Sequence, residues 1–355
     1  MAAARNFLGG LCMPAFKANV RGRIGSFFRL FFTATQRYAP FNPRDTELKL
    51  AQKIHFSGDA PVQIESRACE QGRMVFARER PESEDVKNLV VTPNGGGWVG
   101  SRCYERYSAS APGLRVLLGH RSPAEAYETG YWVQSAHKDT YGDWVSEYLS
   151  AIIRHEPLNA PLFLPAELAS RPYVCRDLAR LAVDFVSVDR PMKIKNATVL
   201  RQQKYFVHFR RRDVAALRKV FAPPCEPPSP GSLVYLSRYG EVSEVADRQY
   251  PNEIVERVVA DCGGRVIRTA DAHPETYRAA ALEADTVVFD HGSAFYNALG
   301  WRPRKVIEIV SDGWWNNAFV MLADAMGIED YTIIRGDLGD RHVAGRLKQA
   351  LSVSA

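Results

Sequence analysis

The stretch DTVVFDHGSAFYNALGW, residues 285–301, joins an apolar run, a short polar turn and a segment of helical character. The run at 285–290 is typical of a buried strand, and a helix is expected to begin near Ser293. His291, Gly292 and Ser293 lie where the strand ends and the helix starts. In open α/β sheets, ligands bind at the carboxyl ends of strands, so this turn is the first candidate site.

The residues around this stretch repeat the same alternation of strand and helix. Alternation of this kind predicts a parallel sheet with helices on both faces, and we expect a Rossmann-like domain over residues 232–355. Strands are predicted at 232–238, 265–268, 285–290, 305–310 and 331–336, and helices at 252–262, 274–284, 316–327 and 341–352.

A proline-rich segment, APPCEPPSPG at 222–231, precedes this domain. Five prolines cannot continue a helix or join a central strand, so we interpret the segment as an interdomain linker. Before it we expect a domain over 45–221, which is β-rich at 45–135 and α/β at 136–221. Its clearest elements are a strand at 160–165 and helices at 166–182 and 211–221.

The segment NGGGWVG, residues 94–100, matches the pattern GxGxxG at Gly95, Gly97 and Gly100. A dinucleotide-binding loop needs a helix that opens within it, whereas the residues that follow here are β-like and aromatic. We therefore predict a glycine-rich hairpin turn. No HExxH, P-loop or GxSxG motif is present, which removes several classes of enzyme.

Residues 1–44 form a basic arm with seven Lys or Arg and no Asp or Glu, whereas the whole chain carries +6. The body is therefore close to neutral, and a nucleic-acid partner is not expected. The aromatic and basic residues at 17–38 suit contact with an anionic membrane surface, packing on the body, or a targeting peptide. No apolar run is long enough to span a bilayer, and the six cysteines are scattered. We expect a cytoplasmic protein, peripheral on the inner membrane face if the arm binds lipid.

Polar residues at the predicted strand ends are candidates for binding a phosphate or a ribose. Arg238 could clamp a phosphate or form a surface ion pair, and Ser293 could donate to an oxygen or cap its helix. Asn252 and Glu253 could contact a ligand or cap the next helix. Glu308, in an apolar strand, could hold ribose hydroxyls or form an internal ion pair. The other candidates at these ends are Ser237, Arg248, His291, Gly292 and Asn297.

Asp143 and Glu147 form a second candidate site in the segment YGDWVSEY. On a helix, two residues four apart share one face. Paired carboxylates suit general base catalysis, because proximity raises the pKa of one of them, although chance placement on the surface would give the same spacing.

These motifs, in this order, resemble the family-61 glycosyltransferases, the capsular polysaccharide biosynthesis type. Members carry an HW..E helix start, a strand ending in ISR, then R…NE, HGAGL.N and a V.E strand. The corresponding segments here, within residues 130–332, are DWVSE at 143–147, LSR at 236–238, Arg248 with NE at 252–253, HGSAFYN at 291–297 and VIEI at 306–309. Asp143 stands where many members have His.

The resemblance implies a GT-B-like fold, in which two Rossmann-like domains face one cleft. It also implies an inverting enzyme without an essential metal or cofactor, which transfers a sugar from a nucleotide-diphosphate donor, expected to be a UDP-sugar, to a surface or capsular glycan. Asp143 would be the catalytic base, with Glu147 as its alternative or partner. A non-catalytic nucleotide- or glycan-binding protein at the membrane is the main alternative, and another Rossmann enzyme such as an epimerase is a third.

Overall fold

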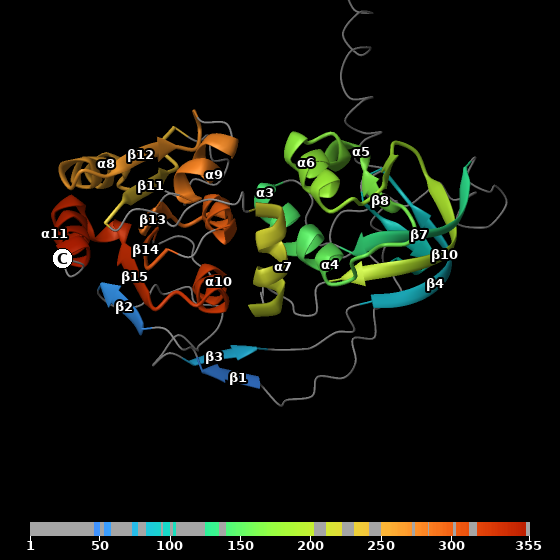
Figure 1. Ribbon diagram of the computed structural model, residues 1–355, viewed down its shortest axis with the longest axis horizontal. Coiled ribbons are helices and arrows are strands. Elements are labelled where there is room, and N and C mark those ends of the chain that lie inside the picture. The colour runs from blue at the N-terminus through green and yellow to red at the C-terminus, as the bar shows by residue number, and fades with distance from the viewer. Residues whose placement is uncertain are drawn as a thin grey trace, which may run out of the picture.

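The computed structural model describes part of the chain in detail. The N-terminal arm, the proline-rich segment up to Pro230, and Arg248 lie outside this part. The described residues are 46–49, 53–57, 73–76, 83–93, 95–99, 102–103, 125–134, 140–201, 211–221, 231–240, 250–271, 274–282, 284–300, 303–311 and 318–352. They form a mixed α/β structure with two large sheets, one mixed and one parallel (Figure 1).

The parallel sheet confirms the alternation that the sequence predicts after the linker. Its six strands run in the order β12-β11-β13-β14-β15-β2, and every neighbouring pair is parallel. The strands are β11 (Leu233–Ser237), β12 (Arg265–Arg268), β13 (Thr286–Asp290), β14 (Lys305–Val310), β15 (Asp330–Arg335) and β2 (Lys53–Ser57).

The order of these strands creates a switch point between β11 and β13. From β11 the chain moves outward to β12, then crosses back over β11 to β13 and continues through β14 and β15 in the opposite direction. Connections that leave two neighbouring strands in opposite directions open a crevice at their carboxyl ends, where ligands of doubly wound sheets bind. The polar turns after β11 and β13 lie at this position.

Strand β2 belongs to the parallel C-terminal sheet, although residues from 45 onward are expected in the first domain. It pairs with β15, with Ile54 opposite Tyr331 and Phe56 opposite Ile333. Because a parallel partner can come from any distance along the chain, its own sequence does not reveal which sheet the strand joins. The early segment therefore completes the far edge of the C-terminal sheet.

Helices cover both faces of this sheet. Val255, Val258 and Val259 are buried at helical spacing on α8, and Val343 and Leu347 on α11; these residues share one apolar cluster with Tyr235 and Ile307 of the sheet. On the other face the helix expected near Ser293 is a 3-10 helix. The helices are α8 (Asn252–Asp261) and α11 (Asp340–Ser352) on one face, α9 (Pro274–Leu282), η3 (Ser293–Gly300) and α10 (Ala318–Met326) on the other, and the short η4 (Gly336–Leu338).

The mixed sheet has seven strands in the order β6-β5-β4-β10-β7-β8-β9. Antiparallel pairing of β4 with β5, closed by a bond from the Thr92 amide to the Gly96 carbonyl (2.9 Å), confirms the predicted glycine-rich hairpin. The strands are β4 (Ser83–Val91), β5 (Gly97–Val99), β6 (Arg102–Cys103), β7 (Ala126–Gln134), β8 (Leu162–Pro165), β9 (Phe185–Val188) and β10 (Met192–Arg201), and β1 (Thr46–Lys49) and β3 (Arg73–Phe76) form a separate pair.

Three consecutive helical turns carry the predicted carboxylate pair. They change from α-helical to π-helical and back, and π-helical turns are frequent at functional sites. The helix expected at 166–182 is instead two helices, because Pro172 starts the second one at its first position. The helices are α3 (Tyr141–Asp143), η2 (Trp144–Leu149), α4 (Ser150–Ile153), α5 (Ala166–Ala169), α6 (Pro172–Arg180) and α7 (Arg211–Phe221).

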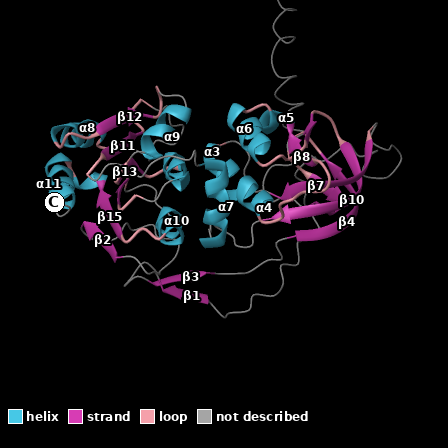
Figure 2. Ribbon diagram, viewed as in Figure 1, coloured by secondary structure: helices cyan, strands magenta, loops and turns pink. Residues whose placement is uncertain are grey.

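The two halves of the molecule share one hydrophobic core. A single cluster of buried side chains includes Trp144 and Phe221 from the first half and Phe295 and Phe319 from the second. The ribbon shows α3, α7, α9 and α10 between the two sheets (Figure 2). Helix α10 is buried along almost its whole length, as expected of a helix that is apolar on every side. Among the helices that the structure describes, none is both long and apolar enough to cross a membrane.

Candidate functional site

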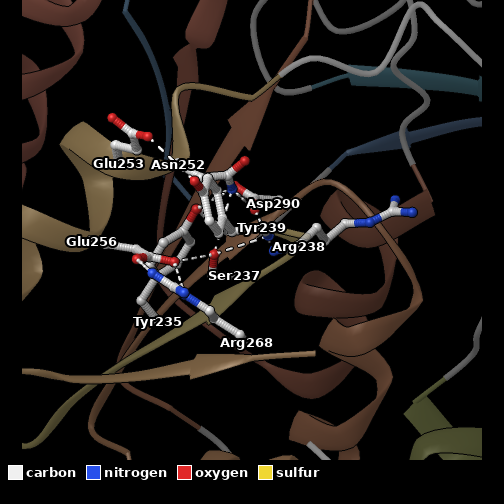
Figure 3. A network of polar contacts seen from close by, with 9 residues as sticks. All are labelled: Tyr235, Ser237, Arg238, Tyr239, Asn252, Glu253, Glu256, Arg268 and Asp290. Carbon is white, nitrogen blue, oxygen red and sulfur yellow. Dashed lines mark hydrogen bonds and ion pairs between the residues drawn. The ribbon is translucent and has the colours of Figure 1, made fainter. Parts of the chain in front are cut away.

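The strand ends at the switch point are joined by a network around Asp290. This carboxylate is fully buried and accepts three hydrogen bonds (Figure 3). The Tyr235 hydroxyl donates to Oδ1 at 2.7 Å, and the Arg238 amide and the Asn252 side chain donate to Oδ2 at 2.7 and 2.6 Å. One side chain thus joins the ends of β11 and β13 to the start of α8.

Burial changes the proton affinity of this network. Burial raises the pKa of Asp290 to about 7, although the three donors oppose the change. Burial is also the main cause that raises the pKa of the Tyr235 phenol, and the neighbouring carboxylate of Asp290 raises it further. Asp290 therefore exchanges its proton near neutral pH at the centre of the candidate site.

Asn252 and Glu253 do not cap helix α8, which was the alternative interpretation of both. Asn252 is the first residue of the helix, and its side chain turns inward to Asp290 and to the Tyr235 hydroxyl, 3.0 Å away. Glu253 is exposed and accepts a hydrogen bond from the Tyr239 hydroxyl at 3.3 Å. Asn252 therefore stabilises the turn after β11, and Glu253 lies at the rim of that turn.

Ser237 is buried and connects β11 to the end of the neighbouring strand β12. Its hydroxyl donates to Glu256 at 2.8 Å, and Arg268 at the end of β12 binds the same carboxylate through two hydrogen bonds of 3.0 and 2.6 Å. Burial raises the pKa of Glu256, but the bonds from Arg268 and Ser237 outweigh it and lower that pKa overall. The guanidinium of Arg268 also lies over the half-exposed ring of Tyr239, 4.5 Å from its centroid.

Arg238 leaves the network and covers the turn after β13. Figure 3 shows its side chain extending away from the residues that its own amide contacts. Its Nη1 donates to the His291 carbonyl at 3.2 Å, and the Tyr250 hydroxyl donates to the same oxygen at 2.9 Å. A Cβ atom at Gly292 would lie 2.7 Å from that Nη1 atom. The space beside the Gly292 backbone is therefore occupied by the Arg238 side chain.

His291 and Glu308 form a buried pair beneath this turn. Neither side chain has exposed surface, and the imidazole Nδ1 contacts one oxygen of Glu308. The other oxygen accepts a hydrogen bond from the Tyr331 hydroxyl at 2.8 Å. Both oxygens of Glu308 are thus bonded within the protein, so the ribose contact expected for it does not fit this arrangement, whereas an internal partner does.

The carboxylate pair of the first half lies against η3 of the second half. A Cβ atom at Gly142 would be 3.0 Å from Cβ of Ser293, so α3 and η3 touch. Burial raises the pKa of the Tyr296 phenol, and the nearby charges of Asp143 and Glu147 raise it further. Both carboxylates are partly exposed, and Asp143 closes a capping box with Thr140.

The structure thus brings most of the predicted residues to one junction, but it divides them by exposure. Ser237, Asn252, His291, Asn297 and Glu308 are buried and hold the site together. Those that reach the surface, at least in part, are Asp143, Glu147, Arg238, Glu253 and Ser293. In the part of the chain that the structure describes, no three His, Cys, Asp or Glu side chains form a group suited to a metal ion.

Several residues of the site were not predicted. Asp290 is central to it, and the signal for it was a carboxylate at the end of an apolar strand, next to residues already chosen. Tyr235 and Tyr331 look like ordinary apolar strand positions, and only their hydroxyl contacts reveal a polar role. Arg278 and Tyr141 meet across the two halves at 3.1 Å, a contact that no local pattern indicates.

No protein-family model matches the chain, and no curated protein matches it either.

Proposed function

We propose that this protein is an inverting, metal-independent glycosyltransferase with a GT-B-like arrangement of two lobes. Its donor would be a nucleotide-diphosphate sugar, expected to be a UDP-sugar, and its acceptor a surface or capsular glycan. The arm at 17–38 would hold it at a membrane surface. The ordered motifs from DWVSE to VIEI and the positions of their residues support the proposal, since motifs more than a hundred residues apart meet at one junction.

One observation carries the proposal. Arg238, at the switch point of a parallel sheet, adjoins the turn before η3, and η3 touches the segment that bears Asp143 and Glu147. A guanidinium suits the diphosphate of a donor, because it presents several donors in a planar fork. A carboxylate on the facing element suits the removal of a proton from an acceptor hydroxyl.

The reaction needs one base and one stabiliser of charge. The acceptor hydroxyl gives its proton to Asp143, or to Glu147, as its oxygen forms a bond to the anomeric carbon. The bond from that carbon to the diphosphate oxygen breaks on the opposite face, so the configuration inverts and UDP leaves with the electron pair. Arg238, with amide groups at the start of η3, would neutralise the charge that develops on the diphosphate.

The buried motif residues have a different role in this proposal. His291, Glu308 and Asn297 hold the turn and the interface in place instead of contacting the donor. Their partners, Tyr331 for Glu308 and Tyr141 for Asn297, are within ordinary hydrogen-bond distance. We therefore assign donor contact to Arg238 and Ser293, with Tyr239 and Glu253 at the rim.

Calorimetry and donor hydrolysis test the proposal together. We expect the protein to bind UDP and to hydrolyse at least one of UDP-glucose, UDP-galactose, UDP-N-acetylglucosamine and UDP-xylose. Arg238→Ala should weaken UDP binding about tenfold or more, because it removes a charge-assisted contact with the diphosphate. Unchanged affinity in this variant would remove Arg238 from the donor site.

Carboxylate variants separate the enzyme from the alternative, a binding protein without catalysis. Asp143→Asn or Glu147→Gln should lower hydrolysis about a hundredfold while UDP affinity stays within twofold, since loss of a general base typically costs 10²–10⁴ in rate. UDP binding without turnover in the unmodified protein would favour the binding protein. GDP- and CMP-linked sugars in the same titrations identify the nucleotide.

A further inference from the structure

A buried arginine connects the two halves next to the candidate site. Arg278 on α9 is 3% exposed, and its guanidinium lies over the ring of Phe221 on α7, 4.4 Å from the centroid. Nη2 of Arg278 donates to the Tyr141 hydroxyl at 3.1 Å, and its Nε lies 3.5 Å from Oδ1 of Asn297. The Tyr141 hydroxyl in turn donates to that same oxygen at 3.0 Å. These three side chains form a closed triangle across the interface.

The first half also supplies a carboxylate near Arg278, which Arg278 shares with Arg176. Asp177 on α6 is fully buried, and one of its oxygens lies 3.7 Å from Nη1 of Arg278. Its other oxygen accepts a hydrogen bond from the indole of Trp144 at 3.0 Å. A buried guanidinium is costly without such a partner.

These contacts hold the chain on both sides of Asp143. Tyr141, two residues before it, is bound by Arg278, and Trp144, directly after it, is bound by Asp177. Asn297, the third corner of the triangle, belongs to η3, which also begins with Ser293. Arg278 thus contacts the carboxylate segment and η3, the helix that follows the strand-end turn, at the same time.

We propose that Arg278 is a positioning residue, which sets the placement of Asp143 relative to the turn at His291–Ser293. This inference rests on the proposed function, because it assigns Asp143 to the reaction. Arg278 itself touches neither donor nor acceptor in this proposal. It acts through Tyr141 and Asn297, and a small displacement of a reacting group can lower a rate about a hundredfold.

The shape of the arginine side chain allows a test that separates positioning from stability. Arg278→Lys keeps a positive charge near Asp177, but an ammonium group cannot reproduce the planar fork that reaches Tyr141 and Asn297 together. We expect this variant to fold and to bind UDP within twofold of the unmodified protein, with hydrolysis of the UDP-sugar roughly a hundredfold slower in kcat. A kcat equal to that of the unmodified protein would overturn the proposal.

A milder variant covers the case in which Arg278→Lys fails to fold. Tyr141→Phe removes only the hydroxyl between Arg278 and Asn297, and should lower kcat roughly tenfold without changing UDP affinity. Tyr131→Phe is the matched control, because the Tyr131 hydroxyl donates to Asn159 Oδ1 at 2.7 Å, a bond between two residues of the first half. The control should leave kcat unchanged, and equal losses in both variants would contradict a positioning role.

Hydrogen exchange keeps this inference distinct from the proposed function. In Tyr141→Phe, amides of 141–149 and 293–297 should exchange faster than in Tyr131→Phe, whether or not the protein turns over a sugar nucleotide. If the unmodified protein binds no UDP and hydrolyses no donor, the glycosyltransferase proposal fails, and the role of Arg278 in catalysis fails with it. If it is active but exchange and kcat are unchanged in Tyr141→Phe, only the positioning role is refuted.

Discussion

At the scale of single residues, Asp290 should make stability depend on pH. Its pKa is about 7 in the folded protein and about 3.9 in an unfolded chain. Between these values the folded state binds a proton that the unfolded state does not, so stability falls as pH rises. The contribution of Asp290 to the free energy of unfolding is complete below about pH 4 and is lost as pH passes through 7. In urea unfolding between pH 5 and 8, the free energy of unfolding of the unmodified protein, relative to that of Asp290→Asn, should fall by up to about 1.4 kcal/mol per pH unit.

The control for this prediction lies at the other end of the same strand. Asp285, partly exposed just before β13, binds Arg304 at 3.2 Å. Asp285→Asn should follow the pH dependence of the unmodified protein, because Asp290 is still present. A constant difference between the unmodified protein and Asp290→Asn across this range would show that Asp290 keeps one charge state.

Gly292 gives a second prediction at this scale. Gly292→Ala would bring a methyl group to 2.7 Å from Nη1 of Arg238, and the flexible arginine must move aside. If Arg238 binds the diphosphate from its position over the turn, the affinity for UDP should fall about as much as in Arg238→Ala. The double variant should be no weaker than either single variant, since both changes remove one contact.

The matched control for this change is Gly345→Ala. On α11, a Cβ atom at Gly345 would meet no other atom within 4 Å. The replacement should stabilise the protein by about 0.5–1 kcal/mol, because alanine favours a helix more than glycine does, and should leave UDP affinity unchanged. Additive losses in the Gly292→Ala/Arg238→Ala double variant would show that the two residues act separately.

At the scale of elements, aromatic packing joins η3 to α10 and the sheet. The rings of Phe289 and Phe295 stack with centroids 4.4 Å apart, and Phe319 meets both edge-on. Phe319→Ala should therefore lower the free energy of unfolding by about 3–5 kcal/mol, measured in urea. Phe185→Ala on the edge strand β9, where the ring is 36% exposed, should cost less than about 1 kcal/mol. Similar costs at the two positions would contradict the inferred core.

Elements with strong local signals could be predicted, and those that depend on distant partners could not. The alternation after the linker predicts five strands of the parallel sheet, because each apolar run is bounded by a helix with periodic apolar residues. Strand β2 carries no sign of its distant partner β15. The 3-10 geometry of η3 and the π-helical turn of η2 also escape a pattern built on the α-helical period.

The candidate site was predictable to the same extent. The strand ends that carry Arg238 and His291 follow from the rule for parallel sheets, and their meeting follows from the strand order. Whether a polar residue at a strand end faces solvent or the interior is decided by packing, as Glu308 and Asn297 show. Contacts such as that between Arg278 and Tyr141 depend on how two halves pack together, about which a single sequence pattern is silent.

At the scale of the whole molecule, the continuous core predicts that both halves unfold together. One apolar cluster runs from Trp144 through Phe221 to Phe319, so opening either half would expose apolar surface of the other. Calorimetry should show a single transition whose measured enthalpy equals its van't Hoff enthalpy. Central amides of β10 in the first sheet and of β14 in the second should share one free energy of exchange. Two separated transitions, or protection lost in one sheet while the other keeps it, would mean that the interface opens independently, and the junction of Asp143 with η3 would then exist for only part of the time.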